Sequence, residues 1–189
     1  VVVVTSAGPR EGASTTAAGL ARVLALSGHR VVLVGGDLRA PGTAGLQGSP
    51  GLADVLTGSA YLGEALVKGS VEGLELLPAG RMPANPSELL GAPMMRDLLR
   101  ELAADRLVII DAPPVLRFTD GVVLAARAGG VILVARAGRT SAEDLHEAAL
   151  AIEQGGGRML GVVLNNVSEL GGKRKGLRSG VVSAESVPV

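Results

Sequence analysis

Short and nearly continuous runs of aliphatic residues recur along the chain, and they predict buried strands. The clear runs span residues 1–5, 31–34, 107–110, 131–135 and 161–164, and a weaker one spans 74–77. Because polar residues do not alternate within these runs, they are typical of strands that are buried on both faces of a parallel sheet.

Segments with the helical period lie between these strands. In residues 14–27, the apolar positions that recur on one face are Ala17, Leu20, Val23 and Leu24. We expect this face to pack on the sheet, because a surface helix buries its apolar stripe. Gly28 follows as the expected C-terminal stop, since glycine readily adopts the left-handed conformation that ends helices.

Two further helical segments complete the pattern. Residues 86–104 are rich in Leu and Met, and Pro93 is expected to divide them into two helices. Residues 140–154 predict another long helix, with Ser141 as its N-cap. This alternation of strands and helices predicts the α/β class, with a doubly wound and mostly parallel sheet flanked by helices. Residues 168–189 lose the periodicity, so the expected domain is 1–167, followed by a flexible tail.

Composition narrows the classes of function. The 189 residues carry 18 basic and 18 acidic side chains, so net charge gives no reason to expect nucleic acid as a partner. Cysteine is absent, which excludes a disulfide framework and a thiolate metal site. No apolar run approaches the length that a membrane-spanning helix requires. The chain begins within a strand-like run, which suggests that it is a piece of a longer protein.

A glycine-rich turn follows the first predicted strand, in "VVVVTSAGPREGASTTAAGLA". The spacing from Ala7 to Gly12 and Ser14 is that of a Walker A loop, whose backbone N–H groups bind phosphate at a helix N-terminus. Ser14 and Thr15 carry the hydroxyl that such a loop offers to Mg²⁺. However, Ala13 occupies the lysine position. From this stretch alone, a turn that binds no ligand remains an alternative.

Carboxylates follow two other predicted strands. Asp37 comes after "VVLVG", where it is either a turn residue or a ligand that holds Mg²⁺ and orients an attacking group. Asp111 ends the run "LVIID", which has the Walker B layout. In doubly wound sheets the ligand lies beyond the carboxyl ends of the strands. We therefore expect both carboxylates to act in metal binding and catalysis, with Ser14 as a further metal ligand.

Several blocks together resemble the bacterial tyrosine kinase (BY-kinase) domain of polysaccharide co-polymerases. They are the loop block above, "VVLVGGDLRAPG", "GLADVLTG", "LLPAGRMPANPSELLGAPMMRDLL", "LVIIDAPPVLRFTDGVVLA" and "VILVARAGRTSAEDL…GVVLNNV". The resemblance covers residues 1–167, and its most specific part is the "LPAG…PxNPxELL" block. It implies a P-loop NTPase fold of the ParA-like, deviant Walker type, which binds ATP or ADP with Mg²⁺ and phosphorylates tyrosines in a tyrosine-rich tail.

The resemblance also implies the residues of the nucleotide site. They are Gly8, Pro9, Arg10, Glu11, Gly12, Ala13, Ser14, Thr15, Arg39 and Asn165, with Asn165 near the adenine. It further implies a role in exopolysaccharide or capsule synthesis, with the domain on the cytoplasmic side of the membrane. The expected partners are a membrane-spanning co-polymerase segment, in cis or in trans, and copies of the chain in a ring.

The chain departs from the family pattern at several positions. Ala13 replaces the lysine, Gly35 replaces the first aspartate of the second acidic motif, and Arg10 replaces a small residue. No tyrosine follows Val167. Loss of one charge-assisted contact costs roughly 1.5–3 kcal/mol, or about 10- to 150-fold in affinity. These departures predict impaired catalysis and a regulatory or binding role.

Two alternatives remain open at this point. The first is an active kinase or ATPase in which Arg10 reaches the phosphates in place of the lysine, rather than being solvated on the outer side of the loop. The second is a relative of the partition and septum-positioning ATPases. That class typically carries an additional lysine early in the loop, where this chain has Gly8.

Overall fold

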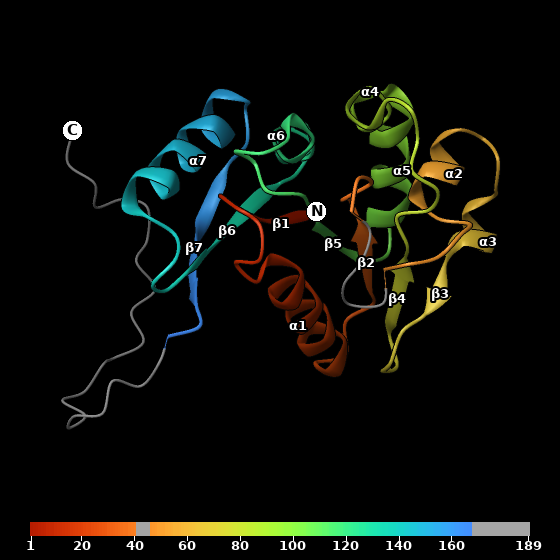
Figure 1. Cartoon of the computed structure of the whole chain (residues 1–189). Coiled ribbons are helices and arrows are strands. Elements are labelled where there is room, and N and C mark those ends of the chain that lie inside the picture. The colour runs from red at the N-terminus through yellow and green to blue at the C-terminus, as the bar shows by residue number, and fades with distance from the viewer. Residues whose placement is uncertain (41–45, 168–189) are drawn as a thin grey trace.

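The computed structural model describes residues 1–40 and 46–167 and shows one seven-stranded sheet with helices on both faces (Figure 1). The strands are β1 (Val2–Ser6), β2 (Val31–Gly35), β3 (Val67–Lys68), β4 (Leu74–Leu77), β5 (Leu107–Asp111), β6 (Gly130–Arg136) and β7 (Met159–Asn165). Their order in the sheet is β3-β4-β2-β5-β1-β6-β7. All neighbouring strands are parallel except β3 and β4, so the predicted fold class is confirmed.

The helices are α1 (Ala13–Leu26), α2 (Leu52–Leu56), α3 (Leu62–Ala65), α4 (Pro86–Gly91), α5 (Pro93–Ala103), α6 (Thr119–Ala125) and α7 (Ala142–Gln154). Pro93 does separate α4 from α5, as the sequence predicts. Ser141 caps α7 by accepting a hydrogen bond from the Asp144 N–H at 2.9 Å. The short helices α2, α3 and α6 and the strand β3 were not predicted, because elements of this length show too little periodicity.

Helix α1 lies on one face of the sheet and the other helices lie toward the opposite face (Figure 1). The predicted buried face of α1 is confirmed at Ala17, and Leu20 and Leu24 are partly buried and pack against the core, but the prediction was wrong at Val23. The buried residues are Ala13, Ala17, Ala21 and Ala25, whereas Val23 is 60% exposed. Small side chains allow the helix backbone to approach the sheet closely. Gly28 follows the helix with φ of 87°, as expected of a C-terminal stop.

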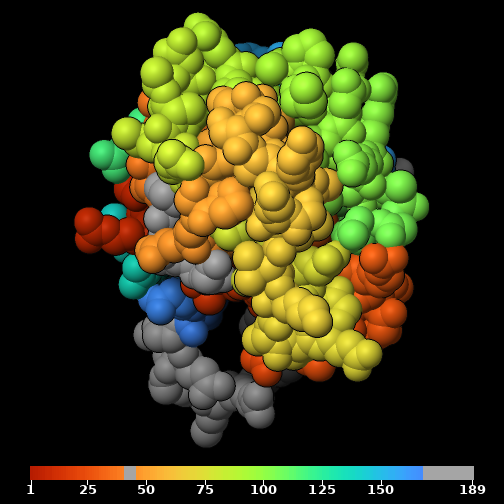
Figure 2. All heavy atoms as spheres, turned by 90° about the vertical axis from the view of Figure 1, so that its right-hand side faces the viewer, coloured from red at the N-terminus to blue at the C-terminus, as the bar shows by residue number. Residues whose placement is uncertain are grey.

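The segment around α2 is fixed to the loop after β4 by one buried carboxylate. Asp54 accepts hydrogen bonds from the Gly51 N–H at 2.9 Å and the Ser49 hydroxyl at 3.2 Å, and it pairs with Arg81 at 3.2 Å. Although burial opposes the effect, these contacts hold the pKa of Asp54 below its ordinary value. Figure 2 shows the resulting surface, with the α2–α3 segment between the α4–α5 segment and the β3–β4 hairpin.

The strand register places Asp111 beside both neighbouring strands at their carboxyl ends. Asp111 is opposite Val4 of β1 and opposite Gly35 of β2. The loop that follows β1 and the turn that follows β2 therefore emerge on either side of Asp111. Within the described ranges, no helix is long and apolar enough to cross a membrane. The expected tail, 168–189, lies outside the described residues, so the boundary at 167 stays a prediction.

Candidate functional site

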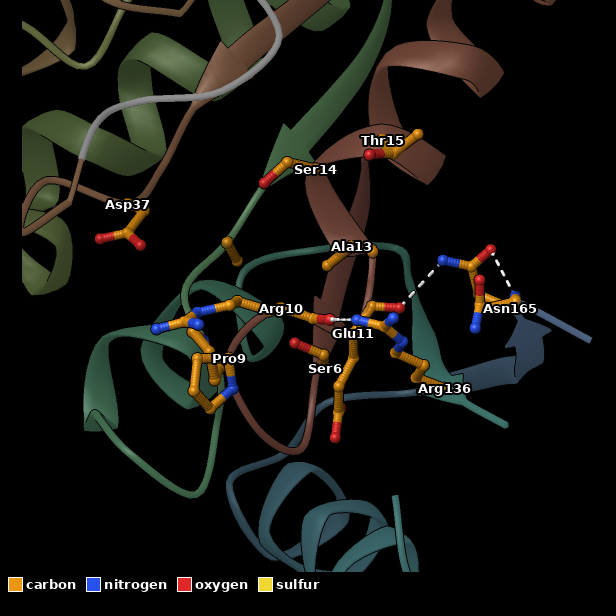
Figure 3. Close-up of a pocket in the computed structure, with 14 residues that line it drawn as sticks. Ser6, Pro9, Arg10, Glu11, Ala13, Ser14, Thr15, Asp37, Arg136 and Asn165 are labelled. Atoms are coloured by element: carbon orange, nitrogen blue, oxygen red, sulfur yellow. Dashed lines mark hydrogen bonds between the residues drawn. The ribbon is translucent and has the colours of Figure 1, made fainter. Parts of the chain in front are cut away.

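A cleft of about 480 Å³ opens at the carboxyl ends of the strands. Its walls are formed by Ser6, residues 9–15 of the glycine-rich loop, Asp37, Ala112, Pro114, Arg136, Asn165 and Asn166. Figure 3 shows the loop residues on one side of this space and Asp37 on the other. Most of the residues expected at the nucleotide site are thus brought together, although Gly8, Arg39 and Asp111 are not part of the cleft wall.

The loop backbone is shaped to bind an anion. Arg10 and Gly12 have positive φ angles of 62° and 102°, and α1 begins directly afterwards at Ala13. No side chain caps this helix N-terminus. The first N–H groups of a helix have no partner within the helix, and the helix dipole adds about half a positive charge there. The beginning of α1 is therefore a suitable binding place for phosphate.

A buried glutamate supports the loop from behind. Glu11 is 5% exposed, and its carboxylate accepts hydrogen bonds from the Gly8 N–H at 3.0 Å and from the Thr140 hydroxyl at 2.7 Å. Its side chain points away from the cleft in Figure 3. Glu11 and Gly8 thus contribute to the shape of the loop. Their contact with nucleotide, which the resemblance implied, stays a prediction.

Two further side chains hold the loop from the ends of β6 and β7. Arg136 Nη1 donates to the carbonyl oxygen of Arg10 at 3.1 Å, and Asn165 Nδ2 donates to the carbonyl oxygen of Glu11 at 3.0 Å. No sequence motif indicated a role in the site for Arg136 or Thr140. Its position in the sequence could have indicated Arg136, because it is the polar residue that ends β6, as Asp111 ends β5.

The expected metal-binding carboxylates differ in environment. Asp37 is half-buried, and its Oδ1 atom accepts hydrogen bonds from the N–H groups of Arg39 and Ala40 at 3.1 and 3.0 Å. Asp111 is only 7% exposed. Burial raises its pKa to about 6; a hydrogen bond from Ser14 opposes this rise, and the charge of Asp37 adds to it. A cation bound between these groups would favour both charged carboxylates.

The raised pKa gives a pH-dependent cost of folding, which Asp111→Asn should remove. In the folded protein the Asp111 carboxyl keeps its proton up to about pH 6, whereas in the unfolded chain it loses the proton near pH 3.8. The protonated carboxyl therefore leaves the free energy of unfolding at its full value below pH 3.8, and this free energy falls as the pH rises through 6. The full shift corresponds to about 3 kcal/mol. We expect the variant to gain stability over the wild type between about pH 4 and about pH 8. Urea unfolding of both proteins without Mg²⁺ measures this, and a gap that does not widen with pH would contradict it.

Arg39 lies outside the cleft wall, because its guanidinium is held elsewhere. Its Nε atom donates to the fully buried Asp120 at 2.6 Å. Its Cζ atom lies over the aromatic ring of Phe118, 4.9 Å from the ring centroid. Ser87 also hydrogen-bonds to Asp120. The side chain therefore joins the turn after β2 to α4 and α6. Its backbone N–H donates a hydrogen bond to Asp37.

Ala13 and Gly35, which replace charged residues of the family pattern, differ in the space that is available for a larger side chain. Ala13 is the first residue of α1, is 8% exposed and forms part of the cleft wall. Gly35 is buried at the end of β2, and a Cβ atom there would lie 2.9 Å from the Ala79 nitrogen and 3.3 Å from Leu46 Cβ. A longer side chain can therefore extend from position 13 into the cleft, whereas one at position 35 requires the backbone to shift.

The donor set fits Mg²⁺ only in combination with a phosphate ligand. Among residues 1–40 and 46–167, no three His, Cys, Asp or Glu side chains gather as a metal site. Protein-bound Mg²⁺ commonly uses one or two carboxylates together with substrate phosphates and water. Asp37 and Asp111, with the Ser14 hydroxyl and the free N–H groups of α1, have the chemistry for this arrangement.

Known proteins are similar to this chain both in sequence and in fold. The chain is 38% identical over 168 residues to tyrosine-protein kinase YwqD of Bacillus subtilis, covering 87% of this chain and 71% of YwqD. The chain belongs to the bacterial tyrosine kinase family. The solved kinase domain of the Escherichia coli tyrosine kinase ETK is 31% identical and superposes with a TM-score of 0.85, covering 93% of this chain and 70% of that one. No protein-family model matches the chain.

The family includes much longer proteins, and its fold is also found outside the family. This chain spans between 22% and 24% of four other curated relatives. The septum site-determining protein MinD of Pyrococcus horikoshii, whose structure contains Mg-ADP, has a TM-score of 0.69 at 23% identity. Identity at that level shows a shared fold alone, and the stronger similarity is to the tyrosine kinases.

Proposed function

We propose that this chain is a nucleotide-binding domain of the tyrosine kinase family in which phosphoryl transfer is impaired, and that it acts as a binding or regulatory module in exopolysaccharide or capsule synthesis. The observation that carries this proposal is the combination of an anion-binding loop with Ala13 at the position of its lysine. Ground-state binding of phosphate can rely on backbone N–H groups. Phosphoryl transfer depends more strongly on positioned charge, because negative charge redistributes in the transition state.

The loop retains a supporting structure that ligand binding would require. Glu11, Thr140, Arg136 and Asn165 together fix its shape through the four hydrogen bonds described above. A decayed turn without a ligand would not need this degree of organisation. We therefore propose that Gly12, Ala13, Ser14 and Thr15 contact the phosphates of ATP or ADP, and that Ser14, Asp37 and Asp111 hold Mg²⁺.

An active tyrosine kinase or ATPase is the second candidate, and one observation favours it. Asp37 and Asp111 both occupy the carboxyl-end edge of the sheet, and Asp111 contacts Ser14. These groups could position Mg·ATP for transfer if another cation replaced the lysine. A partition-type ATPase role has weaker support, because the similarity to MinD shows the fold alone.

The proposed partners and location follow from the relatives. Some relatives are several times longer than this chain, and we propose that a membrane-spanning co-polymerase segment, in cis or in trans, brings the domain to the cytoplasmic face of the membrane. Self-association in a ring belongs to the same proposal. Sedimentation of the chain alone, and together with a co-polymerase segment, would test it.

Calorimetric titration with ATP, ADP and AMP, with and without Mg²⁺, tests the proposed function. We expect ATP and ADP to bind, Mg²⁺ to strengthen the binding, and tyrosine phosphorylation and ADP release to stay at background. Asp37→Asn should remove the Mg²⁺ effect while retaining most of the Mg²⁺-free affinity, because the loop backbone is unchanged. Absence of heat at millimolar nucleotide would overturn the proposal, and rapid ADP release would favour the active enzyme instead.

A further inference from the structure

We propose that Arg10 is the cation that meets the terminal phosphates of the bound nucleotide in place of a lysine at position 13, and that Arg136 holds Arg10 in the required conformation. This inference rests on the proposed function, because it concerns the same cleft. A lysine at position 13 would serve both nucleotide binding and phosphoryl transfer, whereas Arg10 would serve binding alone. Arg10 would supply charge for binding, from a position that differs from that of the lysine used in transfer.

The backbone at Arg10 is the first observation. Arg10 and Asn166 are the non-glycine residues with positive φ among the described residues, at 62° and 56°. This region is unfavourable for a long side chain and is normally taken by glycine, asparagine or aspartate. Residues in such conformations persist where the surrounding structure enforces them, and they cluster at ligand sites. Arg10 thus has a backbone conformation that glycine would adopt without strain, and the surrounding structure must hold the arginine in it.

The direction of the side chain is the second observation. Arg10 is exposed and forms part of the cleft wall. In Figure 3 its guanidinium extends from the loop on the side of Asp37, whereas Arg136 lies toward Asn165. Within the described ranges, the Arg10 side chain has no ion pair or hydrogen bond, unlike those of Arg39 and Arg106. Its charge is therefore available to a ligand between the loop and Asp37.

Arg136 provides the restraint that the strained backbone needs. Its Nη1 atom holds the carbonyl oxygen of Arg10 at 3.1 Å, and its N–H donates to the Thr140 hydroxyl at 2.8 Å. The same hydroxyl donates to Glu11, the next residue of the loop. The last residue of β6 and the turn that follows it thus bind two successive residues of the loop. Arg136 is a positioning residue in this scheme, since it acts through Arg10.

The Arg10→Gly variant distinguishes an Arg10 that binds phosphate from one that is only solvated. Removing the backbone strain affects thermal stability, whereas removing the charge affects the affinity for ATP. Glycine adopts φ of 62° freely, so thermal stability should rise or stay unchanged whichever role Arg10 has. If Arg10 binds phosphate, affinity for ATP should fall roughly 10- to 150-fold, while the affinity for AMP changes little. Arg22→Gln is the matched control, because Arg22 is an exposed arginine of α1 that is not part of the cleft wall. Calorimetry and thermal unfolding of the three proteins give both readouts.

The outcomes distinguish this inference from the proposed function. If the wild type binds ATP and Arg10→Gly binds it equally well, the role of Arg10 is refuted and the proposed function stands. If the wild type binds no nucleotide, both are refuted. An equal loss of affinity for ATP and AMP would also refute the assignment, because it would indicate a general change in the loop rather than a lost terminal-phosphate contact.

A double-mutant cycle tests the part of Arg136. Arg136→Gln should weaken ATP binding when Arg10 is present, and it should add little to the loss in Arg10→Gly. Independent and multiplicative losses would show that Arg136 acts on the ligand directly, which would overturn its role in holding Arg10. Folding of each variant is checked by thermal unfolding, and Arg136→Lys is the conservative comparison, since it retains charge but lacks the planar donor group.

Discussion

Ala13→Lys is expected to raise the affinity for Mg·ATP by roughly 10- to 150-fold and to give measurable ATP turnover. The reason is that the new ammonium would lie at the start of α1, beside the anion-binding loop backbone. There it can contact the β- and γ-phosphates, where a P-loop lysine acts. Calorimetry measures the gain in affinity, and release of ADP or phosphate measures turnover.

Position 13 borders the cleft that this lysine is expected to enter. Ala13 forms part of the cleft wall, so a longer side chain at this position can extend into the cleft. Ala13→Met is the matched control, because methionine has similar length and helix propensity but no charge. Equal effects of the two substitutions would show that added contact surface, rather than charge, changes binding. An unchanged affinity for Mg·ATP when Ala13→Lys is made both in the wild type and in the Arg10→Gly variant would contradict the view that Ala13 is what weakens the site.

The result also bears on Arg10, because both side chains would supply charge to the same phosphates. If Arg10 already fills this role, Ala13→Lys should produce a larger gain in the Arg10→Gly background than in the wild type. Turnover should respond to Lys at position 13 in both backgrounds, since transfer depends on where the charge is placed. The comparison therefore distinguishes charge for binding from charge for transfer.

Much of the fold was predictable because its signals are local. The aliphatic runs that predicted β1, β2, β5 and β6 are continuous, as strands buried on both faces require. The run that predicted β7 was expected to be buried in the same way, and this was wrong. β7 is the last strand of the sheet, and Leu160, Val162 and Leu164 are 45%, 50% and 59% exposed. The buried face of α1 was not predictable by counting large apolar residues. The sheet requires a close approach by small side chains, so Ala21 and Ala25 are buried while Leu26 is 65% exposed.

The candidate site was predictable only where its residues follow strands in recognised motifs. Asp111 and Ser14 could be paired from the order of the motifs, and the structure places them in contact. The contacts of Glu11 with Thr140 and of Arg39 with Asp120 join residues 129 and 81 positions apart. Such pairs depend on which strands become neighbours and on the direction of single side chains. A single sequence contains neither kind of information.

Gly12→Ala is expected to abolish detectable ATP binding and to destabilise the fold by about 1–3 kcal/mol. Gly12 has φ of 102°, and a Cβ atom there would lie 1.9 Å from Asn165 Nδ2. Asn165 would have to move and would lose its hydrogen bond to the Glu11 carbonyl oxygen, so β7 would no longer hold the loop.

A matched glycine replacement separates the loss of the loop from a general effect on α1. Gly19→Ala lies in the same helix, and its added Cβ atom meets nothing within 4 Å. Because alanine is favoured over glycine within a helix, this variant should gain about 0.5–1 kcal/mol and bind ATP like the wild type. Urea unfolding and calorimetry of both variants make the comparison. Retained ATP binding in Gly12→Ala would mean that the loop does not need the conformation seen here, and phosphate recognition would then have to come from side chains such as Arg10 rather than from the backbone at the start of α1.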